Sequence, residues 1–298
     1  MLSLAKPEDV PALENIWTMC FGDEREYQDL FFQHRFCPQN TVVWREQGIA
    51  VAMAHLMPYS MPDGWGKEHL CFYLYAVATL PKYQGQGIST HILSFAARTA
   101  QDRGARALSL VPASPALFDF YRKRGYHTEY YVKQAQLSRA DEYGKTAVIF
   151  APCTPEELFA MRESYYGDTP FFVRWGKQAL NYILLESSYV GRECLAFSGK
   201  RHGYLFCEQG NEGSLFIREI GCTKEDFPTV VAALFTRYPK TEKLVFRLKA
   251  DSPLGKGEIL PFGMTCYLSD TEDKANLPMT QRLMKNEKTV PYMGLMMD

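Results

Sequence analysis

The sequence predicts an α+β protein in which mixed sheets are flanked by helices, arranged as two consecutive domains. Its 298 residues exceed what one hydrophobic core usually serves. Apolar runs of strand character alternate with segments of helical periodicity along the chain. The order of elements in the first half recurs in the second, after a polar stretch at 138–145. We therefore expect one domain at 1–145 and another at 146–298, related by a divergent internal duplication.

The first half carries patterns for four helices and five strands, two of them the arms of a hairpin, before the polar stretch. A nearly all-apolar run at 69–79 is typical of a central strand that is covered on both faces. Helical spacing, turn residues and β-rich runs define the other elements: helices at 7–20, 25–34, 88–103 and 114–125, a hairpin at 41–60 turned at Gln47-Gly48, and strands at 105–113 and 126–137.

The second half begins with a capping-box pattern at Thr154–Glu157, which predicts a helix through about Ser164. The remaining patterns follow the order of the first half: a helix from Phe171 to Leu185, a hairpin at 193–209, a strand at 214–222, a helix at 226–239, and strands at 243–250 and 261–269. The apolar end of the chain, KTVPYMGLMMD, predicts a closing strand of the second domain.

Composition excludes several classes of protein. The 33 basic and 34 acidic residues are interspersed, so neither a nucleic-acid stripe nor a membrane-binding patch is expected. The eight cysteines form no CxxC pair and lie mostly in apolar runs, which favours buried, reduced thiols over disulfides or a metal site. No signal peptide or run of membrane-spanning length is visible, so we expect a cytoplasmic protein.

The segment most informative about chemistry is Gln84-Gly85-Gln86-Gly87-Ile88-Ser89, between a buried strand and the start of a helix. The first amides of a helix have no intrahelical partners, and the helix dipole places partial positive charge there. Glycines at 85 and 87 let the backbone approach an anion without a Cβ in the way. This loop therefore predicts a site for phosphate or pyrophosphate.

Two other phosphate-binding motifs do not fit this loop. A Walker A loop would need Lys-Ser/Thr after the glycines, and none follows. A dinucleotide fingerprint would need a third glycine and an acidic residue about twenty positions further on, at the end of a second strand. A plain glycine turn is the remaining alternative from this loop alone.

The segment VATLPKYQGQGIS resembles the acyl-CoA signature of the GNAT superfamily, [Gln/Arg]-x-x-Gly-x-[Gly/Ala]. Downstream, FYRKRGY resembles the family's Phe-Tyr-x-x-x-Gly-Phe/Tyr element, with one helix and one strand between the two motifs, as in the family. The resemblance implies a GNAT fold at 1–145, acetyl-CoA as co-substrate and an N-acetyltransferase activity. Gln84 replaces the commoner arginine, and Ser89 stands where Gly or Ala is usual.

The resemblance also implies roles for individual residues. Val77 and Thr79 would present main-chain groups to the pantetheine arm and polarise the thioester carbonyl. Residues 84–89 would bind the pyrophosphate. Tyr121 would protonate the departing thiolate as general acid, although its aromatic neighbours also fit a purely structural residue. For the general base, the alternatives are His55, Glu68, His69, His127, water or the C-terminal carboxylate.

Most of the chain also resembles the enhanced-intracellular-survival acetyltransferases, loosely in the second half. Those enzymes carry a third, sterol-carrier-like domain, for which this chain is too short. Their terminal carboxylate reaches the active site, which brings Asp298 into consideration here. The second half has no acyl-CoA signature, and Glu225 and Asp226 stand where phosphate would lie. We expect that half to be a degenerate GNAT-like domain that shapes the acceptor site.

The sequence thus predicts transfer of acetyl to a primary amine by direct attack. The acceptor is a small amine or a peptide amine that the sequence does not specify. A non-enzymatic acyl-CoA-binding or sensing protein is the alternative, and a tandem-GNAT aminoacyl or long-chain acyl transferase is a third interpretation. Retention of Tyr121 favours the enzyme.

Overall fold

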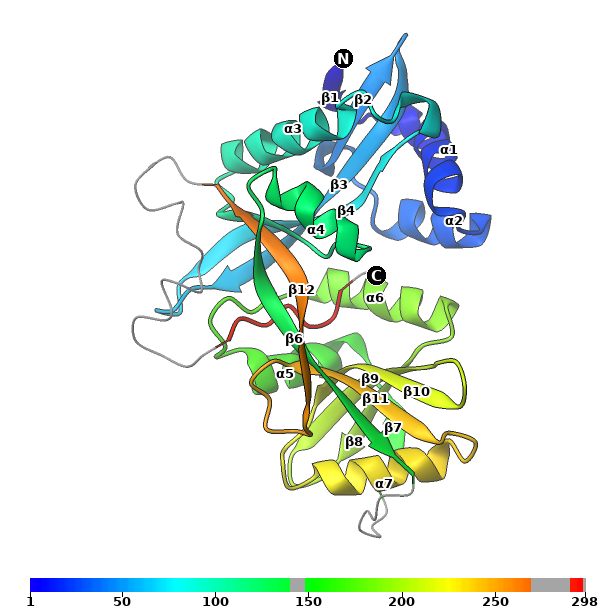
Figure 1. Ribbon diagram of the computed structural model, residues 1–298, viewed down its shortest axis with the longest axis vertical. Coiled ribbons are helices and arrows are strands. Elements are labelled where there is room, and N and C mark those ends of the chain that lie inside the picture. The colour runs from blue at the N-terminus through cyan, green and yellow to red at the C-terminus, as the bar shows by residue number, and fades with distance from the viewer. Residues whose placement is uncertain (140–147, 269–289, 297–298) are drawn as a thin grey trace. The chain divides into compact units, whose positions relative to one another are not determined.

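The structure is a computed structural model that describes residues 1–139, 148–268 and 290–296. The chain forms two compact units (Figure 1). Unit 1 comprises Met1–Met61, Glu68–Glu129 and a segment that begins at Gly263. Unit 2 comprises Pro62–Lys67, Tyr130–Phe262 and the C-terminal segment. The units are therefore discontinuous in sequence, which differs from the predicted halves 1–145 and 146–298.

Unit 1 contains six strands in the order β1-β2-β3-β4-β5-β12. These strands are β1 (Leu2–Leu4), β2 (Thr41–Glu46), β3 (Ile49–Pro62), β4 (Glu68–Thr79), β5 (Ala107–Leu110) and β12 (Gly257–Tyr267). The helices are η1 (Pro7–Asp9), α1 (Val10–Phe21), α2 (Arg25–His34), η2 (Pro38–Asn40), η3 (Pro81–Tyr83), α3 (Ile88–Asp102) and α4 (Pro115–Arg122). The hairpin of β2 and β3 turns at Gln47 and Gly48, both at positive φ, as the sequence predicts.

Pairing in the sheet of unit 1 is mixed. β4 and β5 are parallel, because α3 makes the crossover between them, whereas β12 pairs antiparallel with β5 from Met264–Leu110 to Tyr267–Ala107. Helix α1 buries Leu13, Ile16 and Trp17, and α3 buries the apolar residues along one face. The observed α2 has the predicted bounds, and α3 begins at the predicted residue.

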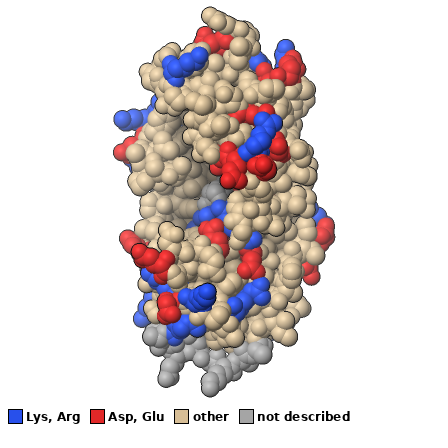
Figure 2. All heavy atoms as spheres, turned by 90° about the vertical axis from the view of Figure 1, so that its right-hand side faces the viewer, with Lys and Arg blue, Asp and Glu red and all other residues tan. Residues whose placement is uncertain are grey.

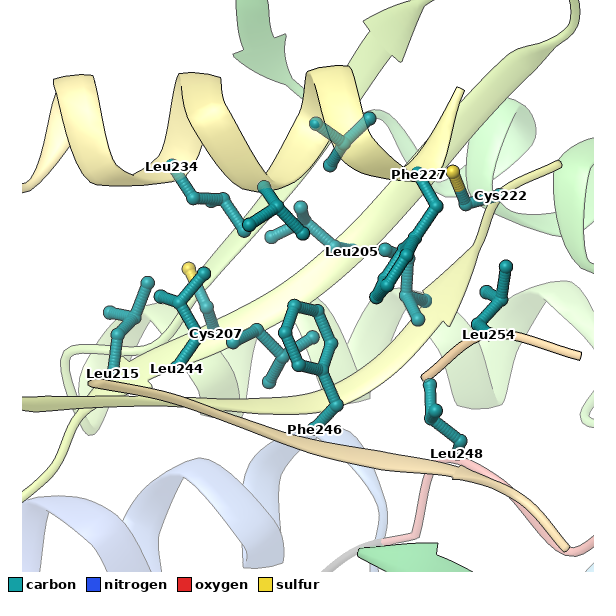
Figure 3. Packing of buried hydrophobic residues seen from close by; sticks show 14 of the residues in the cluster. Leu205, Cys207, Leu215, Cys222, Phe227, Leu234, Leu244, Phe246, Leu248 and Leu254 are labelled. Carbon is teal, nitrogen blue, oxygen red and sulfur yellow. The ribbon is translucent and has the colours of Figure 1, made fainter. Parts of the chain in front are cut away.

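Unit 2 has the strand order β6-β11-β10-β9-β8-β7. These strands are β6 (His127–Ser138), β7 (Phe150–Pro152), β8 (Glu193–Ser198), β9 (His202–Gln209), β10 (Ser214–Gly221) and β11 (Lys243–Lys249), and the helices are α5 (Pro155–Tyr166), α6 (Lys177–Tyr189) and α7 (Phe227–Arg237). Only β10 and β11 are parallel, joined through α7. Apolar residues of α7, among them Phe227 and Leu234, pack onto Leu205, Leu215 and Phe246 of the sheet (Figure 3).

The structure corrects the predicted start of the second helix of this unit. The sequence pattern predicts a helix from Phe171, but α6 begins at Lys177. Phe171 has φ +61, outside the helical region, and the amide of Val173 donates to the carbonyl of Tyr292 at 3.0 Å. Apolar residues at 171–175 thus pack against the end of the chain, which a periodicity argument cannot detect.

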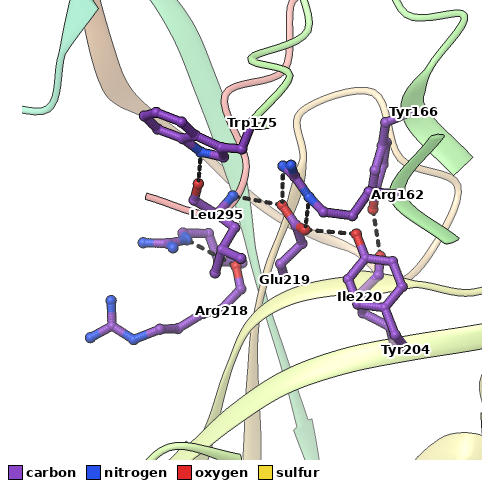
Figure 4. Close-up of polar contacts among 9 residues, drawn as sticks. Arg162, Tyr166, Trp175, Tyr204, Arg218, Glu219, Ile220 and Leu295 are labelled. Carbon is purple, nitrogen blue, oxygen red and sulfur yellow. Dashed lines mark hydrogen bonds and ion pairs between the residues drawn. The ribbon is translucent and has the colours of Figure 1, made fainter. Parts of the chain in front are cut away.

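The C-terminal segment 290–296 is not the predicted strand. It is irregular, and Tyr292, Met293, Leu295 and Met296 are buried. Figure 4 shows how unit 2 holds it: the amide of Leu295 donates to Glu219 at 2.6 Å, and the indole of Trp175 donates to the carbonyl of Leu295 at 2.7 Å. Asp298 lies outside the described residues.

Basic and acidic side chains are intermixed in small groups on the face seen in Figure 2. Within the described ranges, no helix has the length and apolar character of a membrane span. All eight cysteines are free, but only Cys71, Cys207 and Cys222 are buried, and the other five are half-buried. The expectation that the thiols are mostly buried is therefore wrong, because apolar neighbours in sequence do not fix the depth of a side chain.

Candidate active site

The site in unit 1 begins where β4 leaves its partner. The parallel pairing of β4 with β5 runs from Cys71–Ala107 to Tyr73–Ser109, but β4 continues to Thr79. Ala76 has φ +48, which is uncommon for a residue with a Cβ and marks an irregularity in the strand. The main chain of Val77–Thr79 thus lines a pocket on the side where β5 has ended.

The glycine loop connects this strand end to α3. Gly85 and Gly87 have φ of +75 and +79, values that favour glycine, and Gly87 is the N-cap of α3. A Cβ built on either residue would meet no protein atom within 4 Å. The loop backbone therefore borders open space at the positive end of a long helix, which is the arrangement that binds an anion.

These segments and α4 enclose a pocket of about 320 Å³. The residues that line it are Val77, Ala78, Thr79, Tyr83, Gln84, Gly85, Gly87, Ile88, Ser89, Leu117, Phe120 and Tyr121. The pocket thus brings together every site residue expected from the sequence except Gln86, whose amide donates to the carbonyl of Lys82.

Sequence reasoning missed Ala78, Tyr83, Leu117 and Phe120. The spacing of one of them, Leu117, carries a usable signal. Leu117 and Phe120 lie four residues and one residue before Tyr121 on α4, so helical geometry places Leu117 on the same face as the tyrosine. The motif comparison alone gives no weight to these positions.

The side chain of Gln84 binds the main chain at the end of β4. Its amide donates to the carbonyl of Thr79 at 2.9 Å, and the Cys20 thiol donates to the same oxygen at 3.4 Å. The carbonyl of Thr79 is thus held by two donors from different elements. The glutamine therefore fixes the strand–loop junction, a role that does not require the charge of an arginine.

Tyr121 lies on α4 with only 8% of its surface exposed, yet it contributes to the pocket wall. Burial raises the pKa of Tyr121 to about 12, against a smaller lowering by the Arg124 guanidinium. The hydroxyl therefore stays protonated at neutral pH. Its ring packs edge-on against Phe120 and Tyr126, with centroids 5.1 and 5.6 Å away.

Arg124 holds α4, the helix that carries Tyr121, onto α3. Its guanidinium donates to Thr90 Oγ1 through Nε at 3.0 Å and Nη2 at 2.7 Å, and to the carbonyl of Phe120 at 2.7 Å. It also lies over the Phe120 ring, 3.6 Å from the centroid. Since Thr90 is in the first turn of α3, these contacts join the glycine loop and Tyr121 into one assembly.

None of the four side chains considered as a general base lines the pocket. His55 is fully buried, with Nδ1 2.9 Å from Thr41 Oγ1, and burial lowers its pKa to about 3. It lies among aromatic rings, including Phe31 and Trp17. His55 is therefore a neutral core residue. Glu68, His69 and His127 lie at the beginnings of β4 and β6 and do not line the pocket.

The residues that line this pocket lie within a segment of the chain that matches a known protein family. Residues 2–128 match the family described as acetyltransferase (GNAT) domain. The match includes β4, the glycine loop, α3 and α4. A search of curated proteins gave no match.

Solved structures of similar fold extend over nearly the whole chain. A GCN5-related N-acetyltransferase from Anabaena variabilis superimposes with a TM-score of 0.73 at 13% identity, covering 90% of this chain and 73% of that one. Eis1 from Mycobacterium abscessus gives 0.70 at 13% identity, with 90% and 74% covered. A tandem GNAT protein from the clavulanic acid biosynthesis pathway gives 0.53 at 14% identity, with 91% and 100% covered. At such identities the likeness establishes the fold.

Proposed function

We propose that the protein transfers acetyl from acetyl-CoA to a primary amine by direct attack, with Tyr121 as general acid, since residues 2–128 match the acetyltransferase (GNAT) domain family. The observation that carries the proposal is the pocket itself. A glycine loop at the N-terminus of a helix, the end of a strand and a tyrosine that keeps its proton border one cavity of about 320 Å³.

The fit of acetyl-CoA rests on the open space beside the glycine loop. A Cβ on Gly85 or Gly87 would project into space that no protein atom fills. The amides at the start of α3 would hold the pyrophosphate, and Ser89 adds a hydroxyl within the same lining. The main chain of Val77 and Thr79 would pair with the pantetheine arm and stabilise charge on the thioester oxygen.

The reaction needs a proton donor for the departing thiolate. The Tyr121 hydroxyl is neutral at pH 7 and lies in the pocket wall. A raised pKa weakens it as an acid, but the same exclusion of water raises the proton affinity of a thiolate in that pocket. Proton transfer between the two groups thus stays feasible while the thioester bond breaks.

The amine must lose a proton when it attacks the carbonyl. The pocket lining holds no carboxylate or imidazole, and the burial of His55 argues against that residue. We propose that water accepts this proton. Positioning of the amine against the thioester would then supply most of the remaining acceleration.

The second unit would have no acyl-CoA site of its own. At its equivalent strand–helix junction Asp226 is the N-cap residue of α7, and its carboxylate accepts the amide of Lys200 at 2.9 Å and the hydroxyl of Thr223 at 2.8 Å. Although burial opposes ionisation, these donors keep the pKa of Asp226 lowered. A carboxylate thus stands at the N-cap position of α7, although its oxygens bind the 200–201 turn and Thr223 and not the helix amides, and its charge repels phosphate.

A thiol-release assay with acetyl-CoA across a panel of amines tests the proposed reaction. The panel should contain polyamines, aminoglycosides and peptides with free α- or ε-amines. We expect acceptor-dependent release of CoA thiol and an acetylated amine detectable by mass. Tight acetyl-CoA binding without release for any amine would instead support the acyl-CoA sensor.

A further inference from the structure

A second pocket, of about 270 Å³, lies in unit 2 between the end of α6 and the β7–β8 pair. Two cysteines, Cys153 and Cys194, line it together with Arg192 and the hydroxyl-bearing residues Ser187 and Ser188. Both cysteines are free and half-buried. Two free thiols in one small cavity form a pair that the proposed acetyl transfer does not use.

The two thiols are direct neighbours across the strand pair. The antiparallel register of β7 and β8 ends at Pro152–Leu195, so the next step places Cys153 opposite Cys194. The amide of Cys153 donates to the carbonyl of Cys194 at 3.1 Å, which fixes the two residues side by side, and the Cys153 thiol donates to the carbonyl of Thr154 at 3.5 Å. Cross-strand partners lie close to the Cα separation that a disulfide requires, so joining them needs little backbone movement.

Cys153 lies nearer to solvent than Cys194, so we expect the two thiols to react in a fixed order. Cys153 follows the last residue of β7, and its neighbours Pro152 and Thr154 are exposed. Cys194 lies within β8, where burial and the neighbouring Cys153 raise the pKa of its thiol. A reagent entering from solvent therefore meets Cys153 first, with Cys194 in position behind it.

Charge at the pocket indicates the kind of reagent. Arg192 lines it, and its guanidinium donates to Glu208 at 2.7 Å. Arg218 pairs with the same carboxylate at 2.7 Å. Glu193 also lines the pocket, and its carboxylate is paired with Arg237 at 2.6 Å. These two ion-pair groups together contain three guanidiniums and two carboxylates, and the excess of positive charge favours a small molecule that carries carboxylates.

We propose that this pocket is a covalent modification site, at which a small carboxylate-bearing disulfide such as oxidised glutathione reacts with Cys153 and Cys194 then resolves the product. The Cys153 sulfur, after losing its proton to water, attacks one sulfur of the reagent and expels a small thiolate, leaving a mixed disulfide. The Cys194 sulfur, after losing its proton, attacks the Cys153 sulfur and expels the second small thiolate.

Atoms and electrons balance over these two exchange steps. Two protein thiols are oxidised to one disulfide, and the reagent is reduced to two small thiols, which take up the two protons. The product would link β7 to β8 and close the chain segment that contains α5 and α6. A cross-link of that kind restricts the unfolded chain, so the oxidised protein should melt at a higher temperature than the reduced protein.

The test uses the full-length reduced protein, oxidised glutathione as the probe, acid quenching and peptide mapping by mass spectrometry. In the unaltered protein we expect a Cys153–Cys194 disulfide and a raised melting temperature. Cys194→Ser should instead accumulate glutathione on Cys153, whereas Cys153→Ser should leave Cys194 unmodified. Cys37→Ser removes a half-buried thiol of unit 1 and is the matched control, which should behave as the unaltered protein does.

A second arm tests the recognition of carboxylates. Arg192→Met should slow the reaction with oxidised glutathione but not with cystamine, a disulfide that carries amines in place of carboxylates. Preferential modification of Cys37 or another thiol while Cys153 stays reduced would overturn the proposed site. A stable mixed disulfide on Cys153 in the unaltered protein would overturn the resolving role of Cys194. Circular dichroism of each reduced variant establishes that it is folded.

Discussion

Gly87 gives the sharpest residue-level test of the anion site. Gly87→Ala adds a Cβ to a residue at φ +79 that borders the pocket, and we expect it to weaken CoA binding at least tenfold, or about 1.4 kcal/mol. The positive φ itself costs about 1–2 kcal/mol of stability. Calorimetric titration with CoA measures the affinity.

Gly104→Ala is the matched control for that backbone strain. Gly104 has φ +76, and a Cβ there also meets no atom within 4 Å, but the residue follows the end of α3 and does not line the pocket. We expect the two variants to lose similar melting temperature while only Gly87→Ala loses affinity. Equal CoA affinity in both folded variants would refute the assignment of the loop.

Tyr121 and Tyr126 form a second matched pair. Tyr121→Phe should retain acetyl-CoA affinity but reduce turnover by about 10²–10⁴-fold, the range for loss of a positioned acid. Tyr126→Phe should retain turnover, because that buried hydroxyl has no hydrogen-bond partner and its removal is close to neutral for stability. Steady-state rates with one good acceptor measure both.

The pH dependence follows from the same side chain. Burial raises the pKa of Tyr121 to about 12, so the acid keeps its proton through the neutral and moderately alkaline range. Activity that depends on this proton is lost only as pH rises through that value. A fall in kcat with an apparent pKa near 8, retained in Tyr121→Phe, would assign the titration to another group.

At the scale of elements, the buried carboxylate of Glu219 organises the end of the chain. It accepts from Arg162 Nε at 2.8 Å, from the Tyr204 hydroxyl at 2.6 Å and from the amide of Leu295 at 2.6 Å (Figure 4). Burial alone would lower the pKa of Arg162, but the Glu219 charge outweighs it and the pKa is raised. The C-terminal segment is thus docked by charge-assisted hydrogen bonds.

Glu219→Gln should destabilise the protein strongly. The substitution places an amide among donors and leaves a buried guanidinium without its counter-charge, which costs about 3–5 kcal/mol. Asp251→Asn is the control, since it removes an exposed partner of Lys249 and should cost at most about 1 kcal/mol. Urea unfolding measures both. Similar midpoints for the two variants would show that the network does not hold the segment.

Local signals explain which elements the sequence could predict. Gln47-Gly48, the capping box at Thr154 and the glycine loop each specify a turn or a helix start through neighbouring residues, and each is found where expected. The start of α6 could not be predicted, because residues 171–175 bind the distant C-terminal segment. The same limit applies to Phe120, whose place in the pocket depends on how α4 packs against α3.

At the scale of the whole molecule, the prediction of two GNAT-like halves captures the order of elements but not their distribution between the compact units. β12 pairs with β5, more than 140 residues earlier in the chain, and β11 pairs with β6. Strand pairing over such separations leaves no local pattern in the sequence. A prediction from the sequence alone therefore places the domain boundary at the polar stretch 138–145. The recurrence of strand–helix–strand order remains visible because it is local.

The two units also differ in their expected ligand stoichiometry. Because Asp226 occupies the helix N-terminus in unit 2, we expect one CoA per chain. Titration calorimetry and a crystal grown with excess CoA should both give this value, with the nucleotide at the loop of α3. Density for a second nucleotide beside Asp226 would contradict it, and Asp226→Asn provides a variant in which the repulsion is removed.

The docking of the last residues has a consequence for how the protein is made. β12 pairs with β5 in unit 1 and Leu295 completes the contacts of Glu219 in unit 2, so the two units cannot close until residues 267 and 295, respectively, have been translated. Until then unit 1 lacks the strand beside β5 and unit 2 lacks the segment that binds Glu219, and chaperones have time to bind the exposed apolar surface. A premature stop shortly before Leu295 would therefore yield a product that is cleared by proteolysis, even though every residue that lines the pocket of unit 1 had been synthesised.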